Sequence, residues 1–136
     1  MKALVVFESM FGNNQRIAEA IAQGLSEHMA VEVLEVGTAP TSLADDVALL
    51  VVGAPTHMLG MSQPSSRKRA AGQSDRPVVS SGIGVREWLE SLNVPPRSTA
   101  GAAFDTRLST RWLRPFPSAA GKIDKGLRKR GIQTML

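Results

Sequence analysis

Residues 2–25 read KALVVFESMFGNNQRIAEAIAQGL, and the order of the patterns within them sets the fold class. Lys2 to Phe7 is a nearly continuous apolar run, which is typical of a strand buried on both faces of a parallel sheet. A turn-rich segment follows from Glu8 to Asn14. From Gln15 to about His28 an apolar residue recurs at every fourth position. This spacing predicts an amphipathic helix whose apolar face is Ile17, Ile21 and Leu25.

The same order of strand, loop and helix repeats along the rest of the chain. The sequence predicts an edge strand at 31–36 and a fully buried strand at 47–52, closed sharply by Gly53-Ala54-Pro55. Five strands that alternate with helices predict one doubly wound parallel α/β domain over residues 1–136, with its ligand beyond the strand carboxyl ends. The other expected elements are a helix with the stripe Val85, Trp88, Leu89 and Leu92, a strand at 100–104, a helix with Ile123 and Leu127 inward that ends at Gly131, and a strand at 132–136.

Composition excludes several classes of function. The chain has 136 residues, no cysteine and a net charge of +4. Without thiols, disulfides, thiolate zinc sites, iron–sulfur clusters and cysteine nucleophiles are excluded, and we expect no metal site. The basic run Arg67-Lys68-Arg69 lacks interleaved aromatic residues, so we expect no nucleic-acid partner. The first apolar run is too short for a membrane span or a signal-peptide core, which predicts a cytoplasmic protein without a membrane partner.

The segment between the first strand and the first helix is a candidate anion site, made of Ser9, Met10, Phe11, Gly12, Asn13 and Asn14. Free backbone N–H groups and the helix dipole favour an anion there, and Gly12 allows close approach to a phosphate. The loop contains no lysine, so Walker-type and dinucleotide loops fit poorly, and a neutral cradle suits one terminal phosphate. The alternative is an ordinary strand-to-helix turn in which Asn14 caps the helix.

This loop resembles the first loop of the flavodoxin family, Thr/Ser-x-Thr-Gly-Asn-Thr, which wraps the phosphate of FMN. The segments LVVGAPT at 50–56 and AAFDT at 102–106 look like the entries to the family's second and third flavin loops. Flavodoxins themselves illustrate binding at the switch between strands one and three. The resemblance implies a five-stranded parallel sheet of order 2-1-3-4-5 in three α/β/α layers, with FMN as cofactor. It adds two groups of cofactor-binding residues: Pro55, Thr56, His57 and Met58, and Phe104, Asp105, Thr106 and Arg107.

The chain also departs from the family pattern. Phe11 stands where a hydroxyl is usual and Asn14 where threonine is usual, which removes at least one side-chain hydrogen bond to phosphate. There is no tyrosine, so aromatic stacking on the flavin would have to come from Trp112 or His57. Family members generally continue past the fifth strand into a closing helix, for which no residues remain here. A sheet face left without that helix would favour a homo-oligomer.

Two functions from different classes stay open at the sequence level. The first is an FMN-dependent electron carrier or small quinone-type reductase, working with a redox partner protein or a small-molecule acceptor. The second is a flavodoxin-derived binding or assembly module that has lost the cofactor. The sequence identifies no catalytic residue. A receiver domain is excluded because Phe7-Glu8 and Gly53-Ala54 stand where its acidic residues are needed, and a low-molecular-weight tyrosine phosphatase needs a cysteine.

Overall fold

A computed structural model of the chain describes residues 1–10, 12–57, 60–61, 80, 82–95, 99–106 and 119–134, without the side chains of Thr56 and His57. The elements, in chain order, are β1 (Lys2–Phe7), α1 (Asn13–Leu25), β2 (Ala30–Glu35), the 3-10 turn η1 (Val36–Thr38), β3 (Val47–His57), β4 (Gly60–Met61), α3 (Val85–Ser91), β5 (Ala100–Thr106), α4 (Ala119–Lys129) and β6 (Gln133–Thr134).

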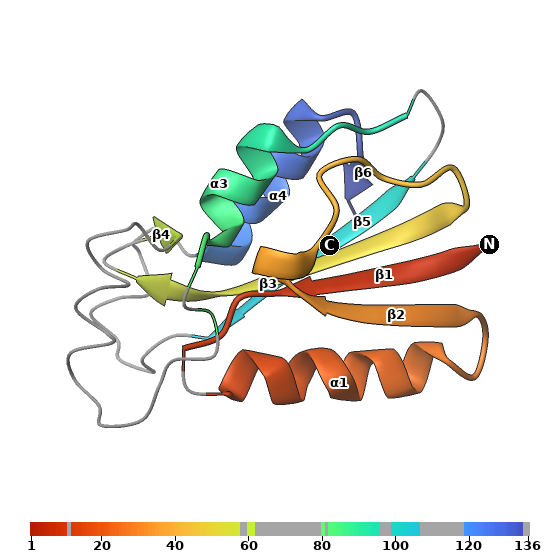
Figure 1. The fold of residues 1–136 in the computed structure, drawn as a ribbon, viewed down its shortest axis with the longest axis horizontal. Helices are drawn as coiled ribbons and strands as arrows, with labels where there is room; N and C mark the ends of the chain where they lie inside the picture. The colour runs from red at the N-terminus through yellow and green to blue at the C-terminus, as the bar shows by residue number, and fades with distance from the viewer. Residues whose placement is uncertain are drawn as a thin grey trace.

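Five strands form a parallel sheet in the order β2-β1-β3-β5-β6, and β4 pairs antiparallel with the end of β3. Helix α1 lies on one side of this sheet, and α3 and α4 lie together on the other (Figure 1). The predicted doubly wound sheet of order 2-1-3-4-5 is confirmed. Because the long strands are parallel, β1 and β3 end at the same edge, where Phe7 is paired with Gly53.

Side chains that alternate along the strands fill two cores. On the side of α3 and α4, Leu4 and Val6 of β1 pack with Trp88, Ile123 and Leu127, all of them buried. The predicted core role of Trp88 is therefore confirmed, and its indole N–H donates to the backbone oxygen of Pro40 at 3.0 Å. The core under α1 is smaller and is built on Val5, Phe7, Ala18, Ala22 and Val51.

Helix α1 is rotated relative to the sequence expectation. Its buried residues are Asn14, Ala18 and Ala22, whereas Ile17 is 36% exposed. Of the predicted apolar face, Ile17 was therefore wrong, whereas Ile21 and Leu25 do pack against the core under α1. Ala18 and Ala22 are small enough to bring the helix backbone close to the strands. The larger Ile21 and Leu25 then pack beside that contact, where they stay partly buried.

Strand β3 does not close at Gly53-Ala54-Pro55 but continues to His57. The backbone oxygen of Gly53 accepts a hydrogen bond from the N–H of Glu8 at 2.8 Å, so Gly53 is directed toward β1. Hydrogen-bonding direction alternates along a strand, so Pro55 is directed to the same side, beyond the end of β1. A missing N–H costs nothing there, and the strand can pass through the proline.

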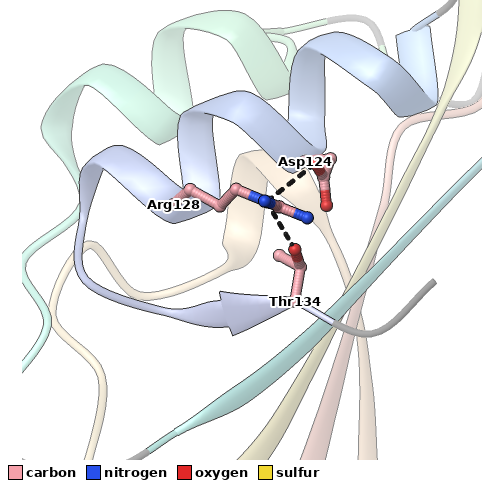
Figure 2. Close-up of polar contacts among 3 residues, drawn as sticks. All are labelled: Asp124, Arg128 and Thr134. Atoms are coloured by element: carbon pink, nitrogen blue, oxygen red, sulfur yellow. Dashed lines mark hydrogen bonds and ion pairs between the residues drawn. The ribbon is translucent and has the colours of Figure 1, made fainter.

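The carboxyl-terminal elements follow the prediction. Helix α4 buries Ala119, Ile123 and Leu127, and Gly131 adopts a φ of +84° just after the helix ends. Strand β6 covers only Gln133–Thr134 of the expected 132–136, and residues 135–136 lie outside the described part of the chain. Figure 2 shows how Arg128 joins the last two elements: its Nε lies 3.0 Å from the Asp124 carboxylate and donates to Thr134 Oγ1 at 2.8 Å.

Candidate functional site

The candidate site lies where β1 and β3 end side by side. The chain leaves β1 toward α1 and β2 on one side, whereas β3 stands on the other side of β1. Connections that depart in opposite directions from neighbouring parallel strands open a crevice at the carboxyl edge of the sheet. Glu8 to Met10 continue from the end of β1 at this edge, and Gly12 precedes the first residue of α1 (Figure 1).

Ser9 fixes the start of this loop through three hydrogen bonds. Its N–H donates to Ser80 Oγ at 2.9 Å, and its backbone oxygen accepts from the N–H of Ser80 at 2.7 Å. Its hydroxyl oxygen accepts from the N–H of Gly12 at 3.0 Å. Ser9 and Ser80 are each 1% exposed, so these bonds are shielded from water. Ser9 is thereby attached to Ser80, which precedes α3, and to Gly12, which precedes α1.

Gly12 is the N-cap of α1, with φ +94° and ψ −6° and no side-chain capping bond. The alternative in which Asn14 caps the helix is wrong, because Asn14 lies inside the first turn. In the described part of the chain, nothing accepts from the backbone N–H groups of Asn13, Asn14 and Gln15. Three unpaired donors at the positive end of a helix of 13 residues are an arrangement that favours an anion.

Asn14 contributes a hydrogen-bond acceptor, whereas the three backbone N–H groups are donors. It is 1% exposed, and its Nδ2 donates to the backbone oxygen of Glu8 at 3.1 Å. Its Oδ1 is buried, and none of the described residues donates a hydrogen bond to it. An unpaired buried acceptor is unfavourable, and a ligand hydroxyl would satisfy it.

Glu8 is fully buried, at 0% exposure, although it directly follows the apolar strand. Its Oε1 accepts from the N–H of Val85 at 2.7 Å, in the first turn of α3. The carboxylate therefore joins the end of β1 to the start of α3. Sequence reasoning placed Glu8 in a turn and missed this role, as it missed Ser80, which lies in an irregular stretch with no distinguishing pattern.

Arg16 changes the electrostatics expected of the loop. Its Nη2 donates to Asn13 Oδ1 at 2.6 Å, and its Nη1 lies 3.4 Å from the position that a Cβ on Gly12 would occupy. The guanidinium thus folds back over the amino end of α1. The prediction of a neutral cradle considered only residues between the strand and the helix, so it left this guanidinium out of account. The spacing of three residues between Asn13 and Arg16 was the available signal, since such pairs meet on a helix surface.

The second and third predicted segments lie next to each other. Pro55 is paired with Thr106 across β3 and β5, and both are half-buried. Thr56 and His57 pair with Met61 and Gly60 of β4, so the expected second loop begins only after His57. The structure therefore brings the ends of β3 and β5 to the edge where the segment after β1 begins.

Two residues of the third segment have packing partners of their own. The ring of Phe104 packs against Gly53, where it occupies the space that a Cβ would need. The Oδ2 of Asp105 accepts from the N–H of Ala120 at 2.9 Å and so holds the start of α4. The predicted residues Phe11, Met58 and Arg107, together with Trp112, lie outside the described residues.

No group of three or more histidine, aspartate or glutamate side chains in the described part of the chain is arranged to hold a metal ion. Among the helices that the structure describes, none is long and apolar enough to cross a membrane.

Together, the doubly wound sheet and a donor-rich loop at the β1–β3 switch define an α/β protein of the class that binds phosphorylated cofactors. The flavodoxin family model matches residues 5–136, and the chain belongs to the flavodoxin family. FMN is the cofactor of this family, and flavodoxins exchange electrons with redox partners. The residues present fit this group, because FMN carries both phosphate oxygens that accept hydrogen bonds and ribityl hydroxyls that donate them.

Solved structures share the fold at low sequence identity. A flavodoxin from the domain Archaea is 23% identical, with a TM-score of 0.65 over 99% of this chain and 78% of its own. A Streptococcus pneumoniae TIGR4 flavodoxin is 17% identical, with a TM-score of 0.64 over 98% of this chain and 79% of its own. A WrbA-like flavodoxin from Agrobacterium tumefaciens is 17% identical, with a TM-score of 0.56 over 97% and 74%. A comparison with curated proteins finds no match.

Proposed function

We propose that this chain binds FMN with the phosphate at the Ser9–Asn14 loop and works as a flavin redox protein. In this proposal it passes electrons to a partner protein or reduces a small acceptor of the quinone type. The observation that carries the proposal is the amino end of α1, where three unpaired N–H groups follow a positive-φ glycine at the β1–β3 switch. An apolar ligand would leave these donors unused, and an anionic oxygen accepts from them more strongly than a neutral one does.

The chain's own residues bind and orient the cofactor. The first turn of α1 supplies donors for the phosphate, and Asn14 Oδ1 accepts from a hydroxyl of the ligand. The hydrogen bonds of Ser9 to Ser80 and to Gly12 hold the loop in place before binding, which lowers the entropy lost when the ligand binds. When bound, FMN supplies the one- and two-electron chemistry of its isoalloxazine ring.

The same proposal assigns the ring to the neighbouring ends of β3 and β5. Pro55 to Met58 and Phe104 to Arg107 flank it, and the pairing of Pro55 with Thr106 supports a common position for the two segments. Polar or flexible groups predominate among them, so the protein adds little aromatic stacking to the affinity. The phosphate loop consequently supplies a larger share of the binding free energy than the ring does.

A direct comparison of two flavins tests this function. The purified protein is denatured, any released flavin is identified by chromatography, and the refolded chain is titrated with FMN and with riboflavin by fluorescence quenching. We expect FMN to bind more tightly by roughly tenfold or more, because charge-assisted hydrogen bonds to phosphate are absent with riboflavin. Equal affinities would exclude the loop as the phosphate site. No binding of either flavin would instead support a binding module without a cofactor.

A further inference from the structure

Arg16 adds a positive charge beside the amino end of α1. The N–H of Arg16 donates to the backbone oxygen of Gly12 at 3.0 Å, which is the first hydrogen bond of α1. Long side chains on a helix point back toward its amino end. The guanidinium accordingly reaches the N-cap, with Nη2 on Asn13 Oδ1 and Nη1 above Gly12.

This cation is not neutralised by an acid of the described chain. No carboxylate among the described residues forms an ion pair with Arg16, and its hydrogen-bond partner there is the neutral amide of Asn13. The two acids nearest along the chain are engaged elsewhere: Glu19 accepts from Gln15 Nε2 at 3.4 Å, and Glu8 accepts from the N–H of Val85. The planar guanidinium of Arg16 therefore retains N–H donors for an anion that binds at the amino end of α1.

Two further observations indicate that a ligand binds at the first turn of α1. The N–H groups of Asn13, Asn14 and Gln15 meet no acceptor in the parts of the chain that the structure describes. In the same turn, Asn14 is 1% exposed and its Oδ1 has no donor there. The first turn of α1 therefore carries a cation, free N–H donors and a buried acceptor, the kinds of group that a phosphate monoester with hydroxyl groups on its carbon chain would use.

We propose that Arg16 is a phosphate ligand that determines the preference of this protein for a phosphorylated flavin. This inference rests on the proposed function, because the phosphate is that of FMN. A guanidinium can form two parallel hydrogen bonds to phosphate oxygens, and the charge attracts the phosphate over a longer range than the neutral donors do. Because Arg16 is exposed, its contribution is screened by salt.

The test measures the dissociation constants of FMN and riboflavin for the wild-type chain, Arg16→Gln and Arg16→Lys, each at low and at high salt. Arg16→Gln should weaken FMN binding by about fivefold to tenfold at low salt and reduce its salt dependence. Arg16→Lys should bind FMN more tightly than Arg16→Gln but less tightly than the wild type, since lysine retains the charge but cannot form two parallel hydrogen bonds. Riboflavin affinity should not change in either variant.

Lys125→Gln is the matched control, because it removes one exposed positive charge from α4, on the other side of the sheet. It should bind both flavins as the wild type does, and circular dichroism should show an intact fold in all variants. If Arg16→Gln binds FMN as tightly as the wild type, with the same salt dependence, the role of Arg16 is excluded while FMN binding stands. If the wild type binds neither flavin, both proposals are overturned.

Discussion

At Gly12 the backbone combines a φ of +94° with the first hydrogen bond of α1. Gly12→Val should destabilise the fold by about 1–2 kcal/mol, because an L-residue is strained in the left-handed region. It should also weaken FMN binding, since a branched side chain would enter the space between the backbone and Arg16. Chemical denaturation and flavin titration measure the two effects separately.

Gly131→Val is the control for strain without a ligand. Gly131 has a φ of +84° and lies before β6, at the amino-terminal edge of the sheet, with open space where a Cβ would stand. The Gly131→Val variant should lose about as much stability as Gly12→Val and should bind FMN as tightly as the wild type. Equal FMN affinity in folded Gly12→Val and Gly131→Val would show that Gly12 does not face the phosphate.

Single residues of the site were predictable only where the chain is locally patterned. Gly12 was identified from its place between an apolar run and a helix, where a glycine followed by two asparagines is a recognisable signal. Glu8 and Ser80 were not, because their roles depend on Val85 and Ser9, which are about 70 to 80 residues away along the chain. Arg16 was not named as a site residue, since the direction of its side chain depends on its hydrogen bond to Asn13.

Where β3 pairs with β5, the ring of Phe104 lies against Gly53 and leaves no room for a side chain there. Gly53→Ala should destabilise the protein by about 1–3 kcal/mol, because the added methyl group overlaps that ring and the strands are held by their hydrogen bonds. In the double variant Gly53→Ala/Phe104→Leu, the two effects should be less than additive, because the smaller side chain makes room. Urea denaturation of the four proteins measures the coupling.

Gly24→Ala checks that the effect comes from the contact and not from losing a glycine. Gly24 lies in α1, is exposed and has nothing within 4 Å of a Cβ, so alanine should stabilise the helix by roughly 0.5–1 kcal/mol. Strictly additive free energies in the Gly53 and Phe104 cycle would mean that the ring does not occupy this space.

The succession of strands and helices was predictable because buried strands and amphipathic helices differ in their hydrophobic period. The rotation of α1 was not, since Ile17 and Ala18 are one position apart and the choice between them depends on how closely the helix approaches the sheet. The length of β3 was underestimated at Pro55 for a similar reason. Proline ends a strand only where its N–H would be needed, and that depends on where the neighbouring β1 stops.

For the whole molecule, cofactor binding should appear as thermal stability. A ligand that binds only the native state adds about 2.7 kcal/mol at a concentration one hundred times its dissociation constant. For a domain of this size that corresponds to a rise in Tm of roughly 10 °C. FMN should give this shift, and riboflavin at the same concentration should give a smaller one. Equal shifts in a melting experiment would contradict the preference for phosphate.

The strand order also has a consequence for synthesis on the ribosome. In the sheet, β3 lies on the free edge of the β1–β2 pair, and β5 and β6 follow on that same edge in the order in which they are translated. No strand has to be inserted between two that already pair. A nascent chain that has released residues 1–57 already contains β1, β2 and β3, the three strands next to the proposed phosphate loop. Those strands can associate cotranslationally, before α3 and α4 emerge to cover their second face.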